Sequence, residues 1–192
     1  LNLTIDQAYQ TQVEAALKKI YDQAKAAGAT QYSDGAYAVA RNPKTGAILA
    51  MAGESNDRKS VEIADDALGV INHTFVMGSA IKGATVMGGL MDGVITPTNN
   101  TLPDTPIYLR GTPVKKSVYP VGTFGSLNSE SALEVSSNIY MMQLAMLEGH
   151  AKYVPNSSLT MDSDIFTKMR GYFSQFGLGH KTGIDLPGEA NG

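Results

Sequence analysis

Ser79 and Lys82 lie three positions apart in a stretch of small and apolar residues. Residues at i and i+3 share a helix face, so a helix here would let the hydroxyl and the amine meet within one turn. A serine hydroxyl becomes a good nucleophile when a neighbouring base takes its proton. Burial lowers the pKa of a lysine and so makes it such a base. Gly78 precedes the serine and leaves space for a substrate, so the spacing predicts a nucleophile and its base.

The same spacing also arises by chance, when a solvated lysine follows a capping serine. The surroundings of Lys82 favour the catalytic interpretation, because a purely structural lysine would be out of place in so apolar a helix. The small and apolar residues around it are Phe75, Val76, Met77, Ala80, Ile81, Ala84, Val86 and Met87.

A second candidate is the run Ser136-Ser137-Asn138, which lies between two short segments with helical patterns. A hydroxyl and an amide two residues apart on such a turn can both reach one cleft. There the hydroxyl would relay a proton and the amide would bind a substrate carbonyl. Alternatively, Asn138 is simply the N-cap of a helix that starts at Ile139, and the run taken alone favours this cap.

The composition of the 192 residues narrows the class of protein. The net charge is −3 and the charges are interspersed, which argues against nucleic acid as a partner. Cysteine is absent, so no disulfide and no thiolate metal site is expected. His73, His150 and His180 lack the spacing of metal ligands and are expected on the surface or in packing. No stretch approaches the ~20 apolar residues of a membrane span.

The first part of the chain predicts a helix followed by a hairpin. Apolar residues at helical spacing predict an amphipathic helix over about residues 5–27, with Thr4 and Gln7 as a capping box. A β-hairpin is predicted over about residues 36–52, because proline and glycine in 42–46 favour a turn.

The rest of the chain is predicted to be mainly helical. The polar stretch 54–66 has loop character, and the nucleophile helix is predicted over about residues 78–90. Its glycines cost about 1 kcal/mol each relative to alanine, so we expect close packing against a neighbour. Residues 95–126 are rich in proline and form a long irregular excursion. Further helices are predicted from Ser129, from Ile139 to Glu148, and after a cap at Asp162 or Ser163. The predicted fold class is α+β, a mixed α/β design.

S-x-x-K followed by S-x-N is the motif pair of penicillin-binding proteins and serine β-lactamases. The whole chain resembles the class B penicillin-binding proteins, the monofunctional peptidoglycan transpeptidases, and within them the 2B type. The run Ser136-Ser137-Asn138 is here called the serine motif. The blocks that carry the resemblance are 1–6, 42–52, 132–133 with the serine motif, and 182–189. The resemblance implies a transpeptidase-like fold related to that of serine β-lactamases, with residues 1–192 forming one partial domain.

The resemblance also implies a mechanism of acyl transfer. Ser79 would attack the carbonyl between the two terminal D-alanines of a peptidoglycan stem peptide, with Lys82 as base. Ser136 would protonate the leaving D-alanine, and Asn138 would bind a substrate carbonyl, with Gly78 and Ser137 assigned to substrate binding. β-Lactam antibiotics would acylate the same serine. No metal or organic cofactor is implied.

The third motif of the family, K-T-G, occurs twice as letters, at Lys181-Thr182-Gly183 and at Lys44-Thr45-Gly46. The first matches a loop block that precedes the catalytic motif in the family, and the second belongs to a hairpin turn. We therefore expect the catalytic third motif and three strands of the sheet beyond Gly192. Met77 stands where the family usually has proline before Gly78, which is expected to loosen the entry to the helix.

The resemblance leaves rival functions open. The same serine would serve a β-lactamase or D,D-carboxypeptidase, a β-lactam sensor, or a catalytically inert fragment. The implied location is the extracytoplasmic face of a bacterial membrane, with the membrane anchor and the cell-wall synthesis partners outside this chain.

Overall fold

A computed structural model describes residues 3–56 and 63–191. These residues form two compact units. The first, here called the sheet unit, contains the described residues up to Thr74 together with Gly183–Asn191. The second, the helical unit, is Phe75–Thr182.

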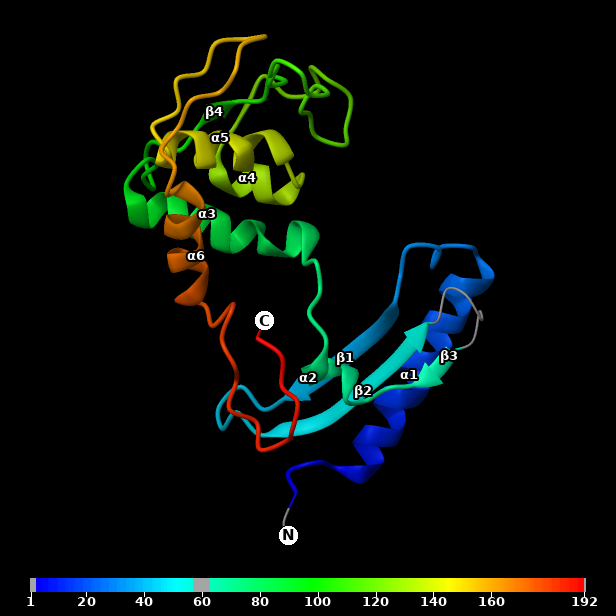
Figure 1. The fold of residues 1–192 in the computed structure, drawn as a ribbon. Coiled ribbons are helices and arrows are strands. Elements are labelled where there is room, and N and C mark those ends of the chain that lie inside the picture. The colour runs from blue at the N-terminus through cyan, green and yellow to red at the C-terminus, as the bar shows by residue number, and fades with distance from the viewer. Residues whose placement is uncertain (1–2, 57–62, 192) are drawn as a thin grey trace. The chain divides into compact units, whose positions relative to one another are not determined.

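The sheet unit is built on three antiparallel strands in the order β1-β2-β3 (Figure 1). They are β1 (Gly35–Arg41), β2 (Ile48–Asn56) and β3 (Ile63–Asp65). The turn between β1 and β2 contains Lys44-Thr45-Gly46, as expected, and Gly46 has a φ of 78°. The prediction that 54–66 is a loop is wrong for its two ends, which pair as strands, while residues 57–62 lie outside the described part.

Helix α1 (Gln7–Ala26) packs against β2 and β1. The predicted capping box at Thr4 is wrong, because the side chain of Asp6 caps the helix by accepting from the backbone N–H of Tyr9. The hydroxyl of Thr4 donates instead to the carbonyl oxygen of Ile48 at 2.7 Å. Aspartate is as good a cap as threonine, and β2 offers Thr4 a better acceptor.

The start of α1 also closes the edge of β2. Strand β3 covers only the end of β2, so the backbone groups earlier in β2 need other partners. The backbone N–H of Asp6 donates to Leu49 at 3.0 Å. The side-chain amide of Gln10 pairs with both backbone groups of Met51, each at 2.8 Å. Ala50 and Ala52 are buried on this strand, and their small size lets α1 approach the sheet.

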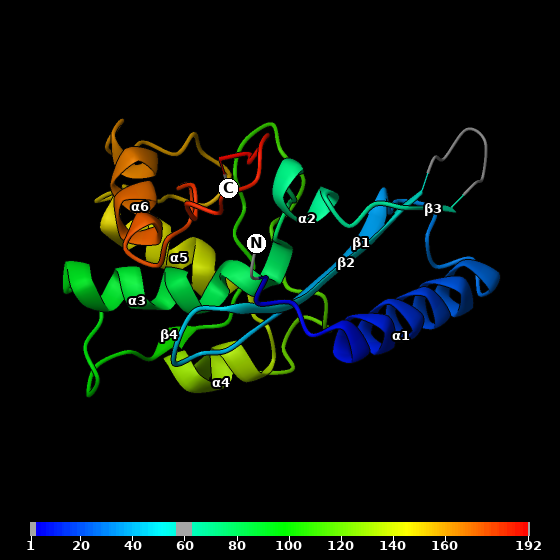
Figure 2. The same cartoon turned by 90° about the horizontal axis from the view of Figure 1, so that it is seen from below.

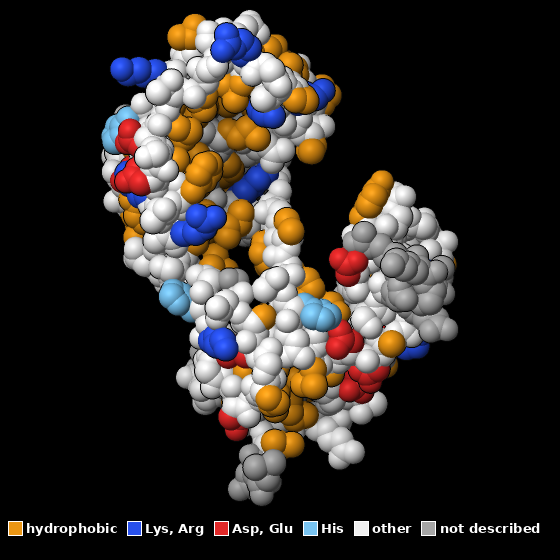
Figure 3. All heavy atoms as spheres, viewed as in Figure 1, with side chains coloured by type: hydrophobic (Ala, Val, Ile, Leu, Met, Phe, Trp, Pro, Cys, Tyr) orange, Lys and Arg blue, Asp and Glu red, His pale blue; other side chains and the backbone are white. Residues whose placement is uncertain are grey.

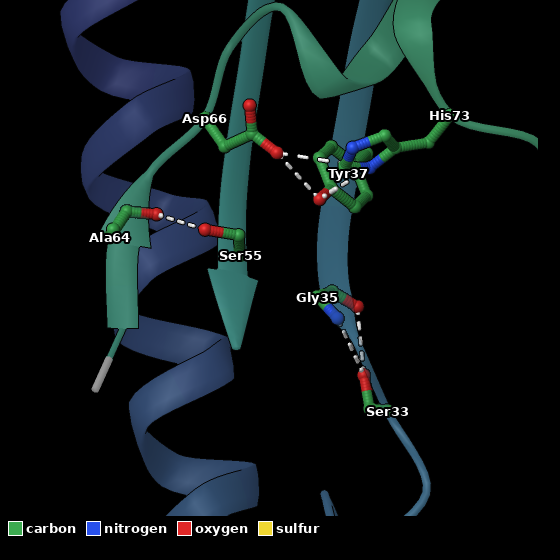
Figure 4. A network of polar contacts seen from close by, with 7 residues as sticks. All are labelled: Ser33, Gly35, Tyr37, Ser55, Ala64, Asp66 and His73. Carbon is green, nitrogen blue, oxygen red and sulfur yellow. Dashed lines mark hydrogen bonds and ion pairs between the residues drawn. The ribbon is translucent and has the colours of Figure 1, made fainter. Parts of the chain in front are cut away.

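A polar network ties β1 to the segment that follows β3 (Figure 4). The phenol of Tyr37 donates to Asp66 at 2.8 Å and lies 3.0 Å from Nδ1 of His73. His73 follows the short helix α2 (Gly69–Asn72). Burial and the neighbouring carboxylate of Asp66 raise the pKa of the Tyr37 phenol. The network therefore fixes α2 against the sheet.

The helical unit contains four α-helices within its described residues, together with one 3₁₀ turn and a two-stranded ribbon (Figures 1 and 2). These elements are η1 (Gly78–Ile81), α3 (Lys82–Asp92), β4 (Leu102–Pro103), β5 (Ser126–Leu127), α4 (Ser129–Glu134), α5 (Asn138–Glu148) and α6 (Ile165–Ser174). Helix α3 contacts α4, α5 and α6 and is the centre of the unit.

The glycines of α3 allow this packing. A methyl group on Gly88 would lie 3.1 Å from the ring of Tyr172 on α6, and one on Gly89 would lie 3.1 Å from Leu144 on α5. The expected close packing of the glycine-rich helix is thus confirmed. The buried core of the unit consists of Val86, Ile95, Leu127, Ala132, Tyr140, Met141 and Leu144.

Of the later helices, α4 begins at Ser129 as predicted, whereas α6 begins later than predicted. A capping box at Asn128 and Ser131 starts α4. The last helix, α6, follows Asp164 rather than Asp162 or Ser163, and no side chain of the described residues caps it. Among the helices in the described part of the chain, none combines the length and the apolar character that a membrane crossing requires.

The helices leave part of their apolar surface open. Figure 3 shows hydrophobic side chains gathered on the face of the helical unit that is turned to the viewer. The exposed large hydrophobic residues of its four α-helices are Met87, Met91, Leu133, Met142, Leu147 and Phe166.

Candidate active site

Ser79 and Lys82 are joined by one turn of 3₁₀ helix. The backbone N–H of Lys82 donates to the carbonyl oxygen of Ser79, which closes the turn at the point where α3 begins. In a 3₁₀ helix the side chains at i and i+3 lie above one another, so the two share one face. Ser79 is exposed, whereas Lys82 is only 8% exposed. The expected separation of the two residues by one helical turn is confirmed.

The amine of Lys82 contacts the serine motif. Its Nζ donates to the carbonyl oxygen of Ser136 at 2.7 Å, to the hydroxyl of Ser136 at 3.0 Å and to Oδ1 of Asn138 at 2.7 Å. In the parts of the chain that the structure describes, no carboxylate forms an ion pair with Lys82. Its surroundings are therefore polar but uncharged, and burial lowers the pKa of the lysine below its ordinary value of 10.5.

In the turn before α5, Ser136 and Asn138 contact Lys82, whereas Ser137 is buried on the other side. Ser136 has a φ of 54°, a left-handed conformation that is uncommon for a residue other than glycine. This conformation lets both the carbonyl and the hydroxyl of Ser136 meet Lys82. Asn138 is the first residue of α5, and its side chain reaches the same amine. The structure thus brings together Lys82, Ser136 and Asn138.

Ser137 has another position. It is 0% exposed and is the N-cap of α5, because its hydroxyl accepts from the backbone N–H of Tyr140 at 3.1 Å. The N-cap of this helix is therefore Ser137, and the alternative that Asn138 is the cap is wrong. A fully buried side chain has no access to a substrate, so the expected contact of Ser137 with substrate is withdrawn in favour of this capping role.

The hydroxyl of Ser79 is not in hydrogen-bond contact with Lys82. Within residues 3–56 and 63–191 it has no hydrogen-bond partner, and the amine of Lys82 is directed to the serine motif instead. Gly78 has a φ of 54°, and a methyl group at this position would meet nothing within 4 Å. Gly78 therefore borders open space, and its role in substrate binding stays a prediction.

Two other lysines noted in the sequence belong to other segments of the chain. Lys44 belongs to the sheet unit, and Lys181 lies in irregular chain after α6. No group of three or more His, Cys, Asp or Glu side chains suited to a metal ion occurs among the described residues.

Asp104 and Ser117 form hydrogen bonds with Ser137 and Asn138 of the serine motif. The sequence did not predict either contact. Ser117 accepts from the backbone N–H of Asn138 at 3.0 Å, and Asp104 accepts from the hydroxyl of Ser137 at 3.2 Å. Both residues come from the irregular excursion 95–126, where no periodic pattern gives a side chain a direction.

Comparisons with known proteins agree with one another. A family model described as "Penicillin binding protein transpeptidase domain" matches residues 36–192. Over the whole chain, the identity is 41% to penicillin-binding protein 2B of Streptococcus pneumoniae serotype 2 (strain D39 / NCTC 7466) and 42% to penicillin-binding protein H of Bacillus subtilis (strain 168). A solved structure of penicillin-binding protein 2B from Streptococcus pneumoniae (strain 5204) covers 99% of the chain with a TM-score of 0.90 at 40% identity. The expected mixed α/β fold is thereby confirmed.

The chain spans 28% and 26% of the lengths of these two relatives and 32% of the solved chain.

Proposed function

The chain belongs to the penicillin-binding protein transpeptidase family, and on this basis we propose that it carries the nucleophilic part of a peptidoglycan D,D-transpeptidase site. The two units together would be part of one transpeptidase domain. The observation that carries the proposal is the buried amine of Lys82, held by Ser136 and Asn138 one 3₁₀ turn from Ser79.

The first step is acylation. The oxygen of Ser79 attacks the carbonyl carbon between the two terminal D-alanines of a stem peptide, and Lys82 takes the hydroxyl proton. The backbone N–H of Ser79 stabilises the oxyanion of the tetrahedral intermediate. The peptide bond then breaks, and the leaving D-alanine receives a proton through the hydroxyl of Ser136. An ester between Ser79 and the peptide remains.

The second step transfers the acyl group. The amine of a neighbouring stem peptide attacks the ester carbonyl and gives a proton to Lys82. The ester bond breaks, Lys82 returns the proton to the oxygen of Ser79, and the new peptide bond is the crosslink. β-Lactams acylate the same serine, because they imitate the D-alanyl-D-alanine end. Lys82 acts as the base in both steps only when it is neutral, and its burial without a carboxylate favours this form.

Asn138 has a donor to spare for substrate. Its Oδ1 accepts from Lys82, so the side-chain NH₂ group is directed elsewhere and suits a carbonyl of the stem peptide or of a β-lactam. Gly78 supports the approach of the same substrate, because the space beside it is open. Attachment to the outer face of the cell membrane and contact with other cell-wall proteins would belong to the whole protein.

The test is the intact mass of the protein after incubation with benzylpenicillin, measured for this chain and for the full-length product of its gene. We expect one penicillin adduct, which Ser79→Ala abolishes and the surface control Ser158→Ala retains. An adduct that persists in Ser79→Ala overturns the assignment of the nucleophile.

The fate of the adduct separates the rival functions. A stable adduct together with crosslinking of stem peptides supports the transpeptidase. Rapid release of hydrolysed penicillin indicates a β-lactamase or carboxypeptidase instead, and a stable adduct without peptide crosslinking indicates a sensor. A wild-type full-length protein that neither forms the adduct nor crosslinks peptides would be inert.

A further inference from the structure

A buried chain of polar groups lies behind the serine motif. Asp104 is 8% exposed and Ser117 is 5% exposed, although both come from the irregular excursion. Oδ1 of Asp104 accepts from the phenol of Tyr119 at 2.9 Å and from the hydroxyl of Ser137 at 3.2 Å. The hydroxyls of Ser117 and Ser137 are 3.3 Å apart, so the groups form one continuous network.

This network supplies the hydrogen bonds that the first turn of α5 lacks. The first N–H groups of a helix have no partner within the helix. The hydroxyl of Ser117 accepts from Asn138 at 3.0 Å and from Ile139 at 3.4 Å, and the hydroxyl of Ser137 accepts from Tyr140. Three successive amides are thus satisfied, two of them by a residue about twenty positions earlier in the chain.

The charge of Asp104 fits this position. The N-terminal end of a helix carries a partial positive charge, and a nearby carboxylate stabilises it. The hydroxyl of Ser137 links the two, because it donates to the carboxylate of Asp104 and accepts from the backbone N–H of Tyr140 in α5. The excursion therefore holds the helix end by both hydrogen bonding and charge.

The network holds a turn that would otherwise relax. A left-handed backbone at a non-glycine residue costs free energy and persists only where the surroundings fix it. Ser136 has this conformation, and its hydroxyl and carbonyl are directed to Lys82 as a result. On the C-terminal side of Ser136, the hydroxyl of Ser137 donates to Asp104 and the backbone N–H of Asn138 donates to Ser117.

We propose that Ser117 and Asp104 are positioning residues, which hold the turn of Ser136-Ser137-Asn138 so that its first and third residues face Lys82. The expected effect on acylation rests on the proposed function. The effect on the surroundings of Lys82 does not, and it is measured separately. Through these two residues, the excursion 95–126 supports the serine motif and does not itself contact a substrate.

The variant that tests this is Ser117→Ala. We expect the rate constant of acylation by benzylpenicillin to fall about tenfold or more, because small misplacements of catalytic groups have large effects on rate. The dissociation constant of the complex before acylation should stay close to that of the wild type. Ser117→Thr keeps the hydroxyl and should recover most of the rate.

A matched control separates positioning from stability. Ser131→Ala removes a hydroxyl that accepts a backbone N–H at 3.0 Å at the start of α4 and that, among the described residues, makes no hydrogen bond with Lys82 or the serine motif. It should lower the thermal midpoint about as much as Ser117→Ala and leave acylation within twofold. Equal losses of rate in the two alanine variants would overturn the proposal.

The second measurement does not depend on acylation. In protein labelled with ¹³C and ¹⁵N at lysine, the side-chain NMR signal of Lys82 is identified by its absence in Lys82→Met. Ser117→Ala should shift this signal, and Ser131→Ala should not. An unchanged Lys82 signal in Ser117→Ala overturns the inference, even if the wild type is not acylated and the proposed function fails. Should Ser117→Ala not fold, Ser117→Cys keeps the volume, weakens the acceptor and must shift the signal likewise.

Discussion

The side-chain nitrogen of Lys82 lies 2.7 Å from the backbone carbonyl oxygen of Ser136, a residue 54 positions later in the chain. The hydroxyl of Ser136 and the amide oxygen of Asn138 complete a set of three neutral acceptors. A buried amine with this set has no counterion, and its charge is therefore costly.

This arrangement predicts the effect of replacing the lysine. Burial lowers the pKa of Lys82, so the folded state binds its proton less tightly than the unfolded state does. Stability should consequently rise with pH between the lowered pKa and 10.5, and a neutral residue of similar volume should remove this cost. We expect Lys82→Met to be at least as stable as the wild type at pH 7 by urea unfolding, and up to about 3 kcal/mol more stable.

Activity should respond in the opposite way. Neither Lys82→Met nor Lys82→Arg can accept the serine proton, so acylation by benzylpenicillin should fall by about 10²-fold or more in both. A Lys82→Met protein that is clearly less stable than the wild type would contradict the view that the amine is a costly buried group.

The backbone of Ser136 predicts a difference between two substitutions that both remove its hydroxyl. Glycine adopts a φ of 54° freely, whereas alanine is strained there. We expect Ser136→Gly to be about 1 kcal/mol more stable than Ser136→Ala by urea unfolding, with similarly slow acylation. If alanine proves as stable as glycine, the left-handed conformation is not held in solution.

Glu148 predicts a dependence of stability on pH that is unrelated to the reaction. It is the last residue of α5 and is 2% exposed, and neither carboxylate oxygen has a hydrogen-bond partner among the described residues. Burial, and then the charge of Asp92, raise its pKa from 4.5 to about 7, while Lys168 opposes them.

The folded state therefore holds the proton of Glu148 more tightly than the unfolded state. Stability from this group is fully present below about pH 4.5 and is lost as the pH rises to about 7. At pH 8 we expect Glu148→Gln to be more stable than the wild type by up to about 3 kcal/mol, with the advantage gone at pH 4. Glu134, the exposed last residue of α4, is the matched control, and Glu134→Gln should show no such dependence. An equal response of the two variants would refute the burial of a protonated Glu148.

The network of Tyr37 predicts a local effect in the sheet unit. Tyr37→Phe leaves Asp66 and His73 without the phenol that lies between them, and a typical lost hydrogen bond costs about 0.5–1.5 kcal/mol. We expect faster hydrogen exchange of the amides of β1 and β2, with the amides of α3 and α5 unchanged. Tyr9→Phe, at a more exposed tyrosine on α1, serves as the control. Exchange that accelerates equally in both variants would contradict the assignment.

The sequence was most informative where one local rule acts alone. The spacing of Ser79 and Lys82 follows from helix geometry, and the glycines of α3 indicated a close neighbour that proved to be Tyr172 and Leu144. Capping was less predictable, because several polar residues near each helix start could serve. Asp6 rather than Thr4 caps α1, and the choice depends on the contact of Thr4 with β2.

Contacts between distant residues had no local signal. That Lys82 and Ser136 belong to one site was expected only through resemblance to a family, since periodicity does not relate residues so far apart. Asp104 and Ser117 gave no indication of their burial within an irregular segment. Glu148 stands at a helix end, where a solvated carboxylate is the ordinary expectation, and only the packing of α3, α5 and α6 encloses it.

The alternation in the serine motif has a consequence for how inhibitors are studied. Ser136 and Asn138 face the amine of Lys82, whereas Ser137 faces away into the protein. A map of residues in contact with a bound drug would omit Ser137 and the residues behind it. If Ser117 and Asp104 position this turn as proposed, mutations at these positions alter the reaction with a drug that they do not contact, and a survey of resistant variants should extend beyond the contact surface.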